Sequence, residues 1–312
     1  MILVTGAAGK TGRAVIRALV ARGKTIRALV HRPEQGRLVE ELGAQDVAVG
    51  DMRLRATMGR AAQGTRAIYH ICPNVHPDEV TIGQTAIAAA RSAGVQHFVY
   101  HSVLHPQIEA MPHHWLKMRV EEQLFQSELN YTILQPAAYM QNVLAQWEHV
   151  LEQGIYSVPY SVETRLGMVD LEDVAEAAAI VLTEPGHGGA TYELSSADVL
   201  SQTEVAAILS QQLGRPVRAE AVSLEAWEKR ARESGLGDYQ TETLAKMFRY
   251  YERYGFWGNP RVLGWLLGRL PTTFAAFIER VVQEATSAWG SAPLKPQAQS
   301  TKPPLGLDST GR

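Results

Sequence analysis

Residues 5–12 read TGAAGKTG, and this stretch fits parts of two different phosphate-binding motifs. Gly9, Lys10 and Thr11 follow each other as at the end of a nucleoside-triphosphate P-loop, whereas the glycines at 6, 9 and 12 have the spacing of a dinucleotide-binding turn. A P-loop requires its first glycine five residues before Gly9, and that position is Val4. Because Val4 ends an apolar run, too few residues remain to wrap a triphosphate. The dinucleotide-binding turn is the better interpretation.

The residues on either side of the turn predict a strand followed by a helix. Residues 2–4 form a short apolar run that is typical of a parallel strand buried on both faces. After Gly12, apolar residues recur at helical spacing until Gly23. Glycines let the backbone approach a pyrophosphate closely, and the start of a helix directs free N–H groups at the anion. A glycine-rich connection without a ligand is the alternative.

The end of the next predicted strand indicates which dinucleotide binds. Residues 25–30 are β-prone, and an NAD-dependent enzyme places an acidic residue after this strand, on the ribose 2'-hydroxyl. This sequence has His31 and Arg32 there instead. A guanidinium pairs with a 2'-phosphate through two parallel hydrogen bonds. We therefore predict NADP(H), with Arg32 as the main contact and Lys10 as a second cation. The alternative is a solvated arginine at a strand end.

Strands and helices alternate through the first half of the chain. Further strand-like runs cover residues 47–49, 67–71, 98–100 and 131–134, and helical segments such as 82–93 lie between them. This alternation predicts an α/β fold of the Rossmann type, a doubly wound parallel sheet with helices on both faces. Ligands bind at the carboxyl ends of such strands, so the residues that follow each strand are expected to line one crevice.

The alternation becomes irregular after Asn142, which predicts a smaller, mostly α C-terminal domain. We place an NADP-binding domain at 1–150 and a discontinuous substrate or lid domain at 151–289. Asp170 and Asp173 are spaced to cap a helix, and Ser201 with Glu204 forms a capping box. We expect a loop or edge strand at 156–160, a strand at 192–194 and a disordered tail at 290–312. The aromatic residues of this part favour core packing, with a lid over a flat apolar molecule as the alternative.

Several segments resemble the NmrA-like family, an atypical branch of the short-chain dehydrogenase/reductase superfamily. The resemblance runs from residue 1 to about residue 285 and begins with the GxxGxxG spacing of the turn. The other matching segments are GD (50–51), VQHFVYHSV (95–103), WLKMRVEEQL (115–124), YTILQPAAYMQN (131–142), GFWGNP (255–260) and LLGRLPTTFAAF (266–277).

This resemblance implies roles for individual residues. The residues implied to form the pyrophosphate turn are Gly6, Ala8, Gly9, Lys10, Thr11 and Gly12. Those implied to flank the adenine are Asp51 and Met52, and those implied to lie beside the nicotinamide ribose are Ile71, Cys72 and Pro73. The resemblance also implies that a helix at 170–184 returns to the first domain.

The catalytic residues of short-chain dehydrogenases are present only in part. These enzymes use a Tyr and a Lys four residues apart, where the Lys lowers the pKa of the Tyr and binds ribose hydroxyls. Lys117 fits the Lys position, but His113 stands four residues earlier. We expect Lys117 to hold the nicotinamide ribose and Ser102 to hydrogen-bond a substrate oxygen. His113 is a candidate proton donor because imidazole titrates near neutral pH, and an exposed polar residue at a helix start is the alternative.

Three further residues, Tyr139, Met140 and Trp147, are candidates for a substrate pocket that accepts a flat apolar molecule. His70 and Cys72 lie close to other histidines, but the spacing and carboxylates of a zinc motif are absent. We therefore predict no metal site.

The composition is that of an ordinary soluble globular protein. A formal net charge of -2 provides no basic field to hold nucleic acid or an anionic membrane. Cys72 is the single cysteine, which fits a reducing compartment, and no apolar run reaches the roughly 18 residues of a membrane span. We expect a cytoplasmic protein that binds neither nucleic acid nor a membrane directly. The sequence carries no signal for an oligomeric state.

Two functions are consistent with these patterns. The first is an NADPH-dependent reductase that passes a hydride to a small apolar acceptor such as a quinone or a cationic dye. Such acceptors are electrophilic and need less help from an enzyme acid. The second is a non-catalytic redox sensor whose NADP(H) occupancy changes its association with a protein partner, and the missing Tyr of the catalytic motif favours it.

Overall fold

The large sheet contains seven strands, and every neighbouring pair in it is parallel. The computed structural model describes residues 1–288. The strand order is β10-β6-β5-β4-β1-β2-β3. The strands are short and rich in apolar residues, as expected for strands covered on both faces. Their bounds are β1 Ile2–Val4, β2 Ile26–Val30, β3 Asp46–Val49, β4 Ala67–His70, β5 His97–His101, β6 Tyr131–Pro136 and β10 Ala190–Leu194.

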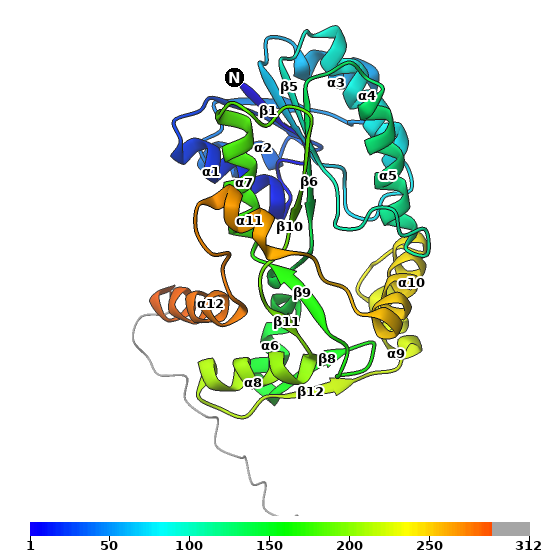
Figure 1. The fold of residues 1–312 in the computed structure, drawn as a ribbon, viewed down its shortest axis with the longest axis vertical. Coiled ribbons are helices and arrows are strands. Elements are labelled where there is room, and N and C mark those ends of the chain that lie inside the picture. The colour runs from blue at the N-terminus through cyan, green and yellow to red at the C-terminus, as the bar shows by residue number, and fades with distance from the viewer. Residues whose placement is uncertain (289–312) are drawn as a thin grey trace, which may run out of the picture.

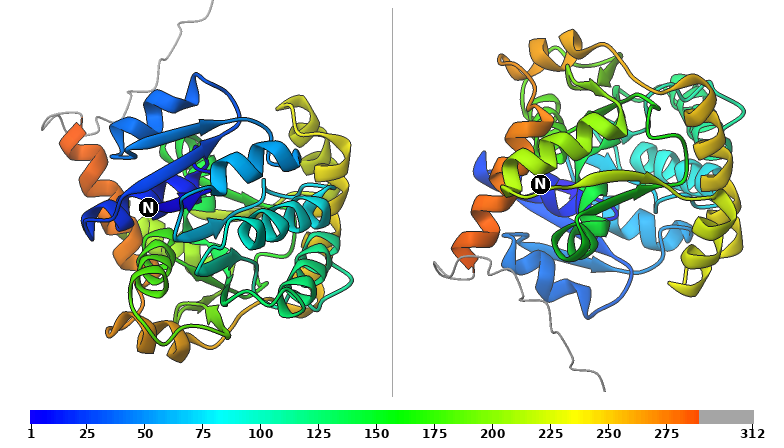
Figure 2. Two further views of the ribbon diagram at one scale, coloured as in Figure 1. Left: turned by 90° about the horizontal axis from the view of Figure 1, so that it is seen from above. Right: turned by 90° about the horizontal axis from the view of Figure 1, so that it is seen from below.

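Helices cover both faces of this sheet (Figure 1, Figure 2). The helices on one face are α1 (Lys10–Ala21), α2 (Gln35–Glu41) and α7 (Leu171–Thr183). Those on the other face are α3 (Arg55–Ala62), α4 (Glu79–Ser92) and α5 (Pro112–Phe125). The predicted Rossmann-type fold is confirmed. The strand order reverses between β1 and β4, which is the point where such sheets bind ligands.

The smaller part of the molecule lies below the large sheet in Figure 1 and combines helices with two short sheets. The strands are β7 Ala138–Tyr139, β9 Leu166–Val169 and β11 Val199–Leu200 in one sheet, and β8 Ile155–Val158 with β12 Arg218–Ala221 in the other. The helices of this part are η1 Met140–Gln146, α6 Trp147–Gln153, α8 Gln202–Leu213, α9 Leu224–Glu233, α10 Asp238–Tyr254 and α12 Phe274–Ala288. Helix α11 (Pro260–Leu267) instead packs against α7 and β10, beside the large sheet (Figure 1).

Two aspartates at the start of α7 connect the large sheet to the C-terminal helices. Asp170 caps α7 as expected, by accepting from the backbone N–H of Glu172, and its other oxygen binds Arg280 of α12 at 2.6 Å. Asp173 was also expected to cap a helix. Instead, its buried carboxylate binds Arg269 at 2.7 Å and accepts from the backbone N–H of Thr272. The aspartate spacing therefore serves tertiary docking as well as capping.

Other local predictions hold with smaller differences. Ser201 and Glu204 form the expected capping box of α8. The strand expected at 192–194 is β10, and it pairs with β6 as the edge of the large sheet, so it belongs with the Rossmann-type part. The segment expected to be a loop or edge strand at 156–160 contains the end of β8, which stops at Val158 before Pro159. The expected tail, residues 290–312, lies outside the described residues, and the domain boundary at residue 150 stays a prediction.

The aromatic residues of the smaller part pack mainly on one another. The rings of Trp227 and Phe248 have centroids 4.8 Å apart, and those of Tyr251 and Phe256 are 5.1 Å apart. Tyr251 and Phe256 are buried, which agrees with core packing. Within residues 1–288, no helix has both the length and the apolar character needed to cross a membrane.

Candidate active site

The glycine turn between β1 and α1 has room only for glycine at its closest point. Gly6 has a φ of 58°, in the left-handed region. A Cβ atom on Gly12 would lie 2.4 Å from the carbonyl oxygen of Gly6 and 2.7 Å from Cα of Ala7. Gly9 is the N-cap of α1, and no side chain caps the N–H groups that follow it. The turn therefore presents the free start of a helix, as anion binding requires.

Thr5 ties the end of β1 to the end of β4. Its Oγ1 donates to the carbonyl oxygen of Ile71 at 3.1 Å, accepts from the Ile71 N–H at 2.9 Å, and lies 3.0 Å from Nδ1 of His70. Ile71 is thereby held against the glycine turn, and its expected place beside the nicotinamide ribose stays a prediction. The next residue, Cys72, is buried, and burial raises the pKa of its thiol far above the usual range. Its thiol therefore stays protonated.

Arg32 is exposed at the end of β2, and its guanidinium has no ion-pair or hydrogen-bond partner among residues 1–288. Gln35 fixes the backbone around it, because Gln35 Oε1 accepts from the N–H groups of His31 and Arg32 at 3.1 and 3.0 Å. Lys10 is exposed as well, at the first position of α1, and it also lacks a partner in the described chain. Two unpaired cations therefore flank the turn, as the prediction of a 2'-phosphate requires.

Asp51, which follows β3, is bound by a neighbouring arginine. Arg53 contacts the Asp51 carboxylate at 2.6 Å and lies 3.6 Å from Asp78. Hydrogen bonds from Arg53 hold the pKa of Asp51 below its ordinary value. Its charge is thus neutralised locally, so it repels a phosphate near Arg32 less. Met52, beside it, is half-buried.

Lys117 belongs to α5, and its ammonium reaches the end of β5, where a carboxylate that the sequence did not indicate holds it. Its Nζ is 3.0 Å from Oε1 of Glu79, in the first turn of α4, and 3.3 Å from the carbonyl oxygen of His101. Tyr100 donates to the same Glu79 oxygen at 2.8 Å. Burial would raise the pKa of Glu79, but Lys117 and Tyr100 outweigh it, and the pKa lies below its ordinary value. Glu79 is therefore a buried carboxylate that fixes the ammonium of Lys117.

Ser102, directly after β5, is turned toward helix α5. It donates to Oε1 of Glu121, and the side-chain amide of Gln135 donates to both oxygens of the same carboxylate at 2.9 and 3.0 Å. Ser102 is 2% exposed. Burial raises the pKa of Glu121. The hydroxyl of Ser102 already donates its proton to Glu121. The expected hydrogen bond from Ser102 to a substrate oxygen stays a prediction, and it requires the bond to Glu121 to break.

His113 stands at the start of α5, half-buried and edge-on to His114, with ring centroids 4.5 Å apart. Its Nδ1 is buried and has no hydrogen-bond partner in the described part of the chain. Burial lowers the pKa of His113 to about 3. The ring is therefore neutral at physiological pH, so an imidazolium proton, on which its candidacy as a proton donor rested, is not available there.

A chain of hydroxyls and one imidazole runs from the glycine turn into the sheet. Thr11 Oγ1 donates to the Tyr139 hydroxyl at 3.3 Å. The same hydroxyl lies 2.7 Å from Nε2 of His101, whose Nδ1 lies 2.7 Å from the Tyr69 hydroxyl. Tyr69 and His101 are buried, whereas Tyr139 is partly exposed. Residues far apart in sequence thus meet at the carboxyl ends of β1, β4, β5 and β6.

The arrangement combines a tight glycine turn, unpaired cations at the start of α1 and after β2, and a lysine of α5 that contacts the end of β5. A model of the NmrA-like family matches residues 1–289. The chain belongs to the NmrA-like family. It is 31% identical to the NAD(P)H azoreductase of Xenophilus azovorans over 279 residues, which are 89% of this chain and 96% of that protein.

Two solved structures resemble this NmrA-like chain over 90% of its length. The NADPH-dependent quinone oxidoreductase from Escherichia coli complexed with NADPH is 27% identical, with a TM-score of 0.79 and 100% of its own chain covered. The Citrobacter sp. triphenylmethane reductase complexed with NADP(H) is 26% identical, with a TM-score of 0.79 and 99% of its chain covered.

The three residues expected in the substrate pocket of this NmrA-like protein lie in different surroundings. Tyr139 reaches the glycine turn, Trp147 at the start of α6 is half-buried, and Met140 is fully buried in the main core. Met140 therefore packs in the core and not on the surface of a pocket. Glu79, Tyr69 and His101 contribute to the site without a local sequence signal for it, because each has a partner more than 30 residues away.

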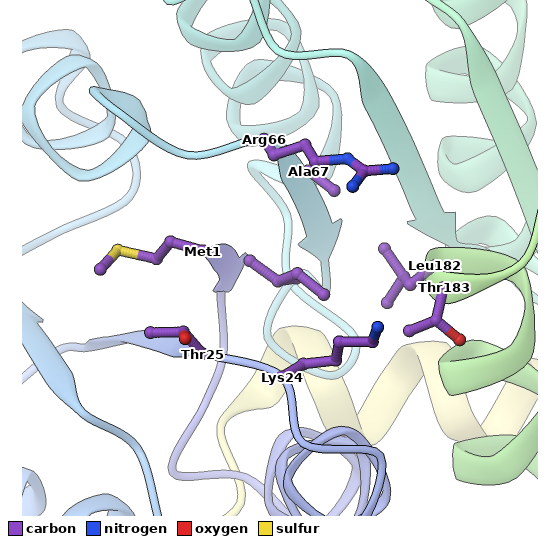
Figure 3. A pocket seen from close by; sticks show the side chains of 8 residues that line it. Met1, Lys24, Thr25, Arg66, Ala67, Leu182 and Thr183 are labelled. Carbon is purple, nitrogen blue, oxygen red and sulfur yellow. The ribbon is translucent and has the colours of Figure 1, made fainter.

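Two recesses in the NmrA-like fold lie away from this crevice. The recess in Figure 3 has a volume of about 90 Å³ and is lined by Met1, Lys24, Thr25, Arg66 and Thr183, among others. These residues stand at the amino ends of β1, β2 and β4 and at the end of α7, opposite the glycine turn. A second recess of about 230 Å³ lies beside β2, β3 and α3. Neither includes a residue of the turn.

Proposed function

We propose that the protein is an NADPH-dependent reductase that passes a hydride to a quinone-like or other conjugated, apolar acceptor. The observation that carries the proposal is the pairing of a tight glycine turn with two unpaired cations, Arg32 and Lys10. A dinucleotide with a 2'-phosphate supplies anions at both places. The relatives named for quinone, azo-compound and dye reduction support the same cofactor and acceptor class.

The nucleotide fits along the carboxyl ends of the strands. The glycine turn and the N–H groups of α1 would hold the pyrophosphate, and Arg32 would hold the 2'-phosphate. Asp51 and Met52 would flank the adenine, while Ile71 to Pro73 would lie beside the nicotinamide ribose. The bound nicotinamide supplies the hydride.

Lys117 orients the cofactor in this proposal. Its ammonium is fixed by Glu79 at 3.0 Å and touches the end of β5, where a ribose hydroxyl is expected. Because no Tyr stands four residues before it, Lys117 has no phenol on its own helix face to activate. The site is therefore better suited to acceptors that are already electrophilic than to ordinary ketones.

Steady-state oxidation of NADPH and NADH by the purified protein tests the proposal, with a panel of quinones, azo dyes and cationic triarylmethane dyes. We expect NADPH oxidation with at least one class and a higher kcat/KM for NADPH than for NADH. Absence of NADPH oxidation with every acceptor would overturn the proposal.

A redox sensor is the second candidate, since Ser102 is bonded to Glu121 and His113 is neutral. Such a protein must bind NADPH and NADP⁺ with different affinity, or change its affinity for a protein partner when one of them binds. Calorimetry with both cofactors tests this, and equal affinities without any effect on a partner count against it.

A cytoplasmic location stays a prediction, based on the single cysteine.

A further inference from the structure

The hydroxyl of Tyr69 determines which nitrogen of His101 carries the hydrogen. Tyr69 is fully buried, and among residues 1–288 the only hydrogen-bond partner of its hydroxyl is Nδ1 of His101 at 2.7 Å. A buried O–H without an acceptor is costly, so Tyr69 donates to Nδ1. Burial lowers the pKa of His101 to about 3, so the ring is neutral and has one N–H. That N–H is therefore at Nε2.

The Tyr139 oxygen consequently accepts two hydrogen bonds. His101 Nε2 donates to it at 2.7 Å and Thr11 Oγ1 donates at 3.3 Å. Both lone pairs of the phenol are then used, and its own hydrogen points to neither partner. Tyr139 is partly exposed at the carboxyl edge of the sheet, where β7 follows β6. The O–H of Tyr139 therefore has no acceptor among residues 1–288 and can donate to a molecule bound at this edge of the sheet.

Tyr139 also lies beside the groups that hold the cofactor. Thr11 belongs to the pyrophosphate turn, and the backbone carbonyl of His101 contacts Lys117 at 3.3 Å. One residue, His101, thus touches the lysine through its carbonyl and the phenol through its ring. A lysine and a phenol converge on one strand end, although they come from α5 and β7 rather than from one helix.

We propose that Tyr139 is the proton donor to the acceptor oxygen, in place of the Tyr missing from the helix, and that His101 is its positioning residue. This inference rests on the proposed reductase function. The acceptor gains two electrons and one hydrogen as hydride from NADPH, and its oxygen gains the Tyr139 proton. Burial raises the pKa of Tyr139 and so disfavours the phenolate, and the hydrogen bonds from Thr11 and His101 offset part of this cost while the proton is on the acceptor. A proton from water restores the phenol after the product leaves.

Acceptor chemistry separates this role from cofactor binding. A quinone needs a proton on oxygen when it accepts a hydride, whereas a cationic triarylmethane dye becomes neutral through the hydride alone. We expect Tyr139→Phe to lower kcat for a quinone on the order of 10²-fold more than kcat for a cationic dye. Tyr131→Phe, at the opposite end of β6, is the matched control and should leave the ratio of the two rates as in the unmodified protein.

Two other measurements separate proton transfer from cofactor binding. NADPH affinity, measured by fluorescence titration, should change less than about threefold in Tyr139→Phe, since a larger loss would assign Tyr139 to cofactor binding. Quinone reduction in a single turnover should be slower in D₂O for the unmodified protein, and Tyr139→Phe should lose this solvent isotope effect.

The outcomes distinguish the two proposals. If the unmodified protein oxidises no NADPH with any acceptor, the reductase function fails. If it reduces quinones and Tyr139→Phe does so at the same rate with the same isotope effect, the reductase stands and the role of Tyr139 is overturned. His101→Gln keeps an N–H donor for Tyr139 and should retain more quinone activity than His101→Leu, and equal activities would overturn the positioning role.

Discussion

Replacing Glu79 by Gln tests the buried ion pair that fixes Lys117. The substitution keeps the size of the side chain but removes the charge that faces the ammonium at 3.0 Å. Breaking a buried pair by neutralising one partner costs ~3–5 kcal/mol in free energy of unfolding. The Lys117 side chain is 14% exposed and regains some hydration, so we expect the lower end, about 3 kcal/mol.

The assay is urea unfolding at pH 7, and an exposed pair on the same helix provides the control. Arg119 and Glu122 of α5 are 2.7 Å apart, but their side chains are 51% and 46% exposed. Glu122→Gln should therefore cost less than about 1 kcal/mol. If Glu79→Gln costs no more than Glu122→Gln, the argument that burial makes Glu79 essential to Lys117 is refuted.

The same pair predicts a dependence on pH with a definite sign. The pKa of Glu79 is lower in the folded protein than its ordinary value, so its contribution to stability is fully present above about pH 4.3. It is lost as the pH falls through the folded pKa, because protonation then favours the unfolded chain. The stability difference between the unmodified protein and Glu79→Gln should therefore be largest at neutral pH and should shrink below about pH 4.

Three further substitutions have definite expected outcomes. Arg32→Ala should weaken NADPH on the order of 10- to 100-fold more than NADH in calorimetry, because only NADPH has the 2'-phosphate, and an unchanged ratio would mean that another residue binds it. Gly12→Ala should abolish cofactor binding, since its Cβ would lie 2.4 Å from a backbone oxygen, whereas Gly59→Ala in α3 meets nothing within 4 Å and should bind normally. Asp170→Ala removes both the cap of α7 and the contact with Arg280, and should cost about 2–4 kcal/mol in urea unfolding, with a loss below 1 kcal/mol contradicting the docking role.

The parts of the fold that follow from local patterns could be predicted from the sequence. Apolar runs that end in glycine or polar residues gave the strands, and Ser201 with Glu204 gave the start of α8, because capping depends on neighbours in the chain. The placement of β10 could not be found in this way. Its five residues pair with β6 about 60 residues earlier, and the pattern of apolar residues does not indicate which strand is the partner.

The site was predictable to the same extent. The glycine turn, Arg32 and Lys117 follow from spacing, and the structure places them along one edge of the sheet. Glu79 could not be found, since a glutamate in the first turn of a helix usually faces solvent. His113 had the spacing for a proton donor, but spacing does not reveal burial, which keeps its ring neutral. Tyr139 was named for a pocket, and its bonds to His101 and Thr11 emerged only from the fold.

The most direct test of the proposed function is a single-turnover reaction of the protein with stoichiometric NADPH and a quinone, followed by chromatography of the products. We expect one NADP⁺ and one hydroquinone to form for each NADPH consumed, faster than in a control without protein. NADPH that binds with measurable affinity but remains unoxidised across the whole panel of acceptors would contradict the reductase function.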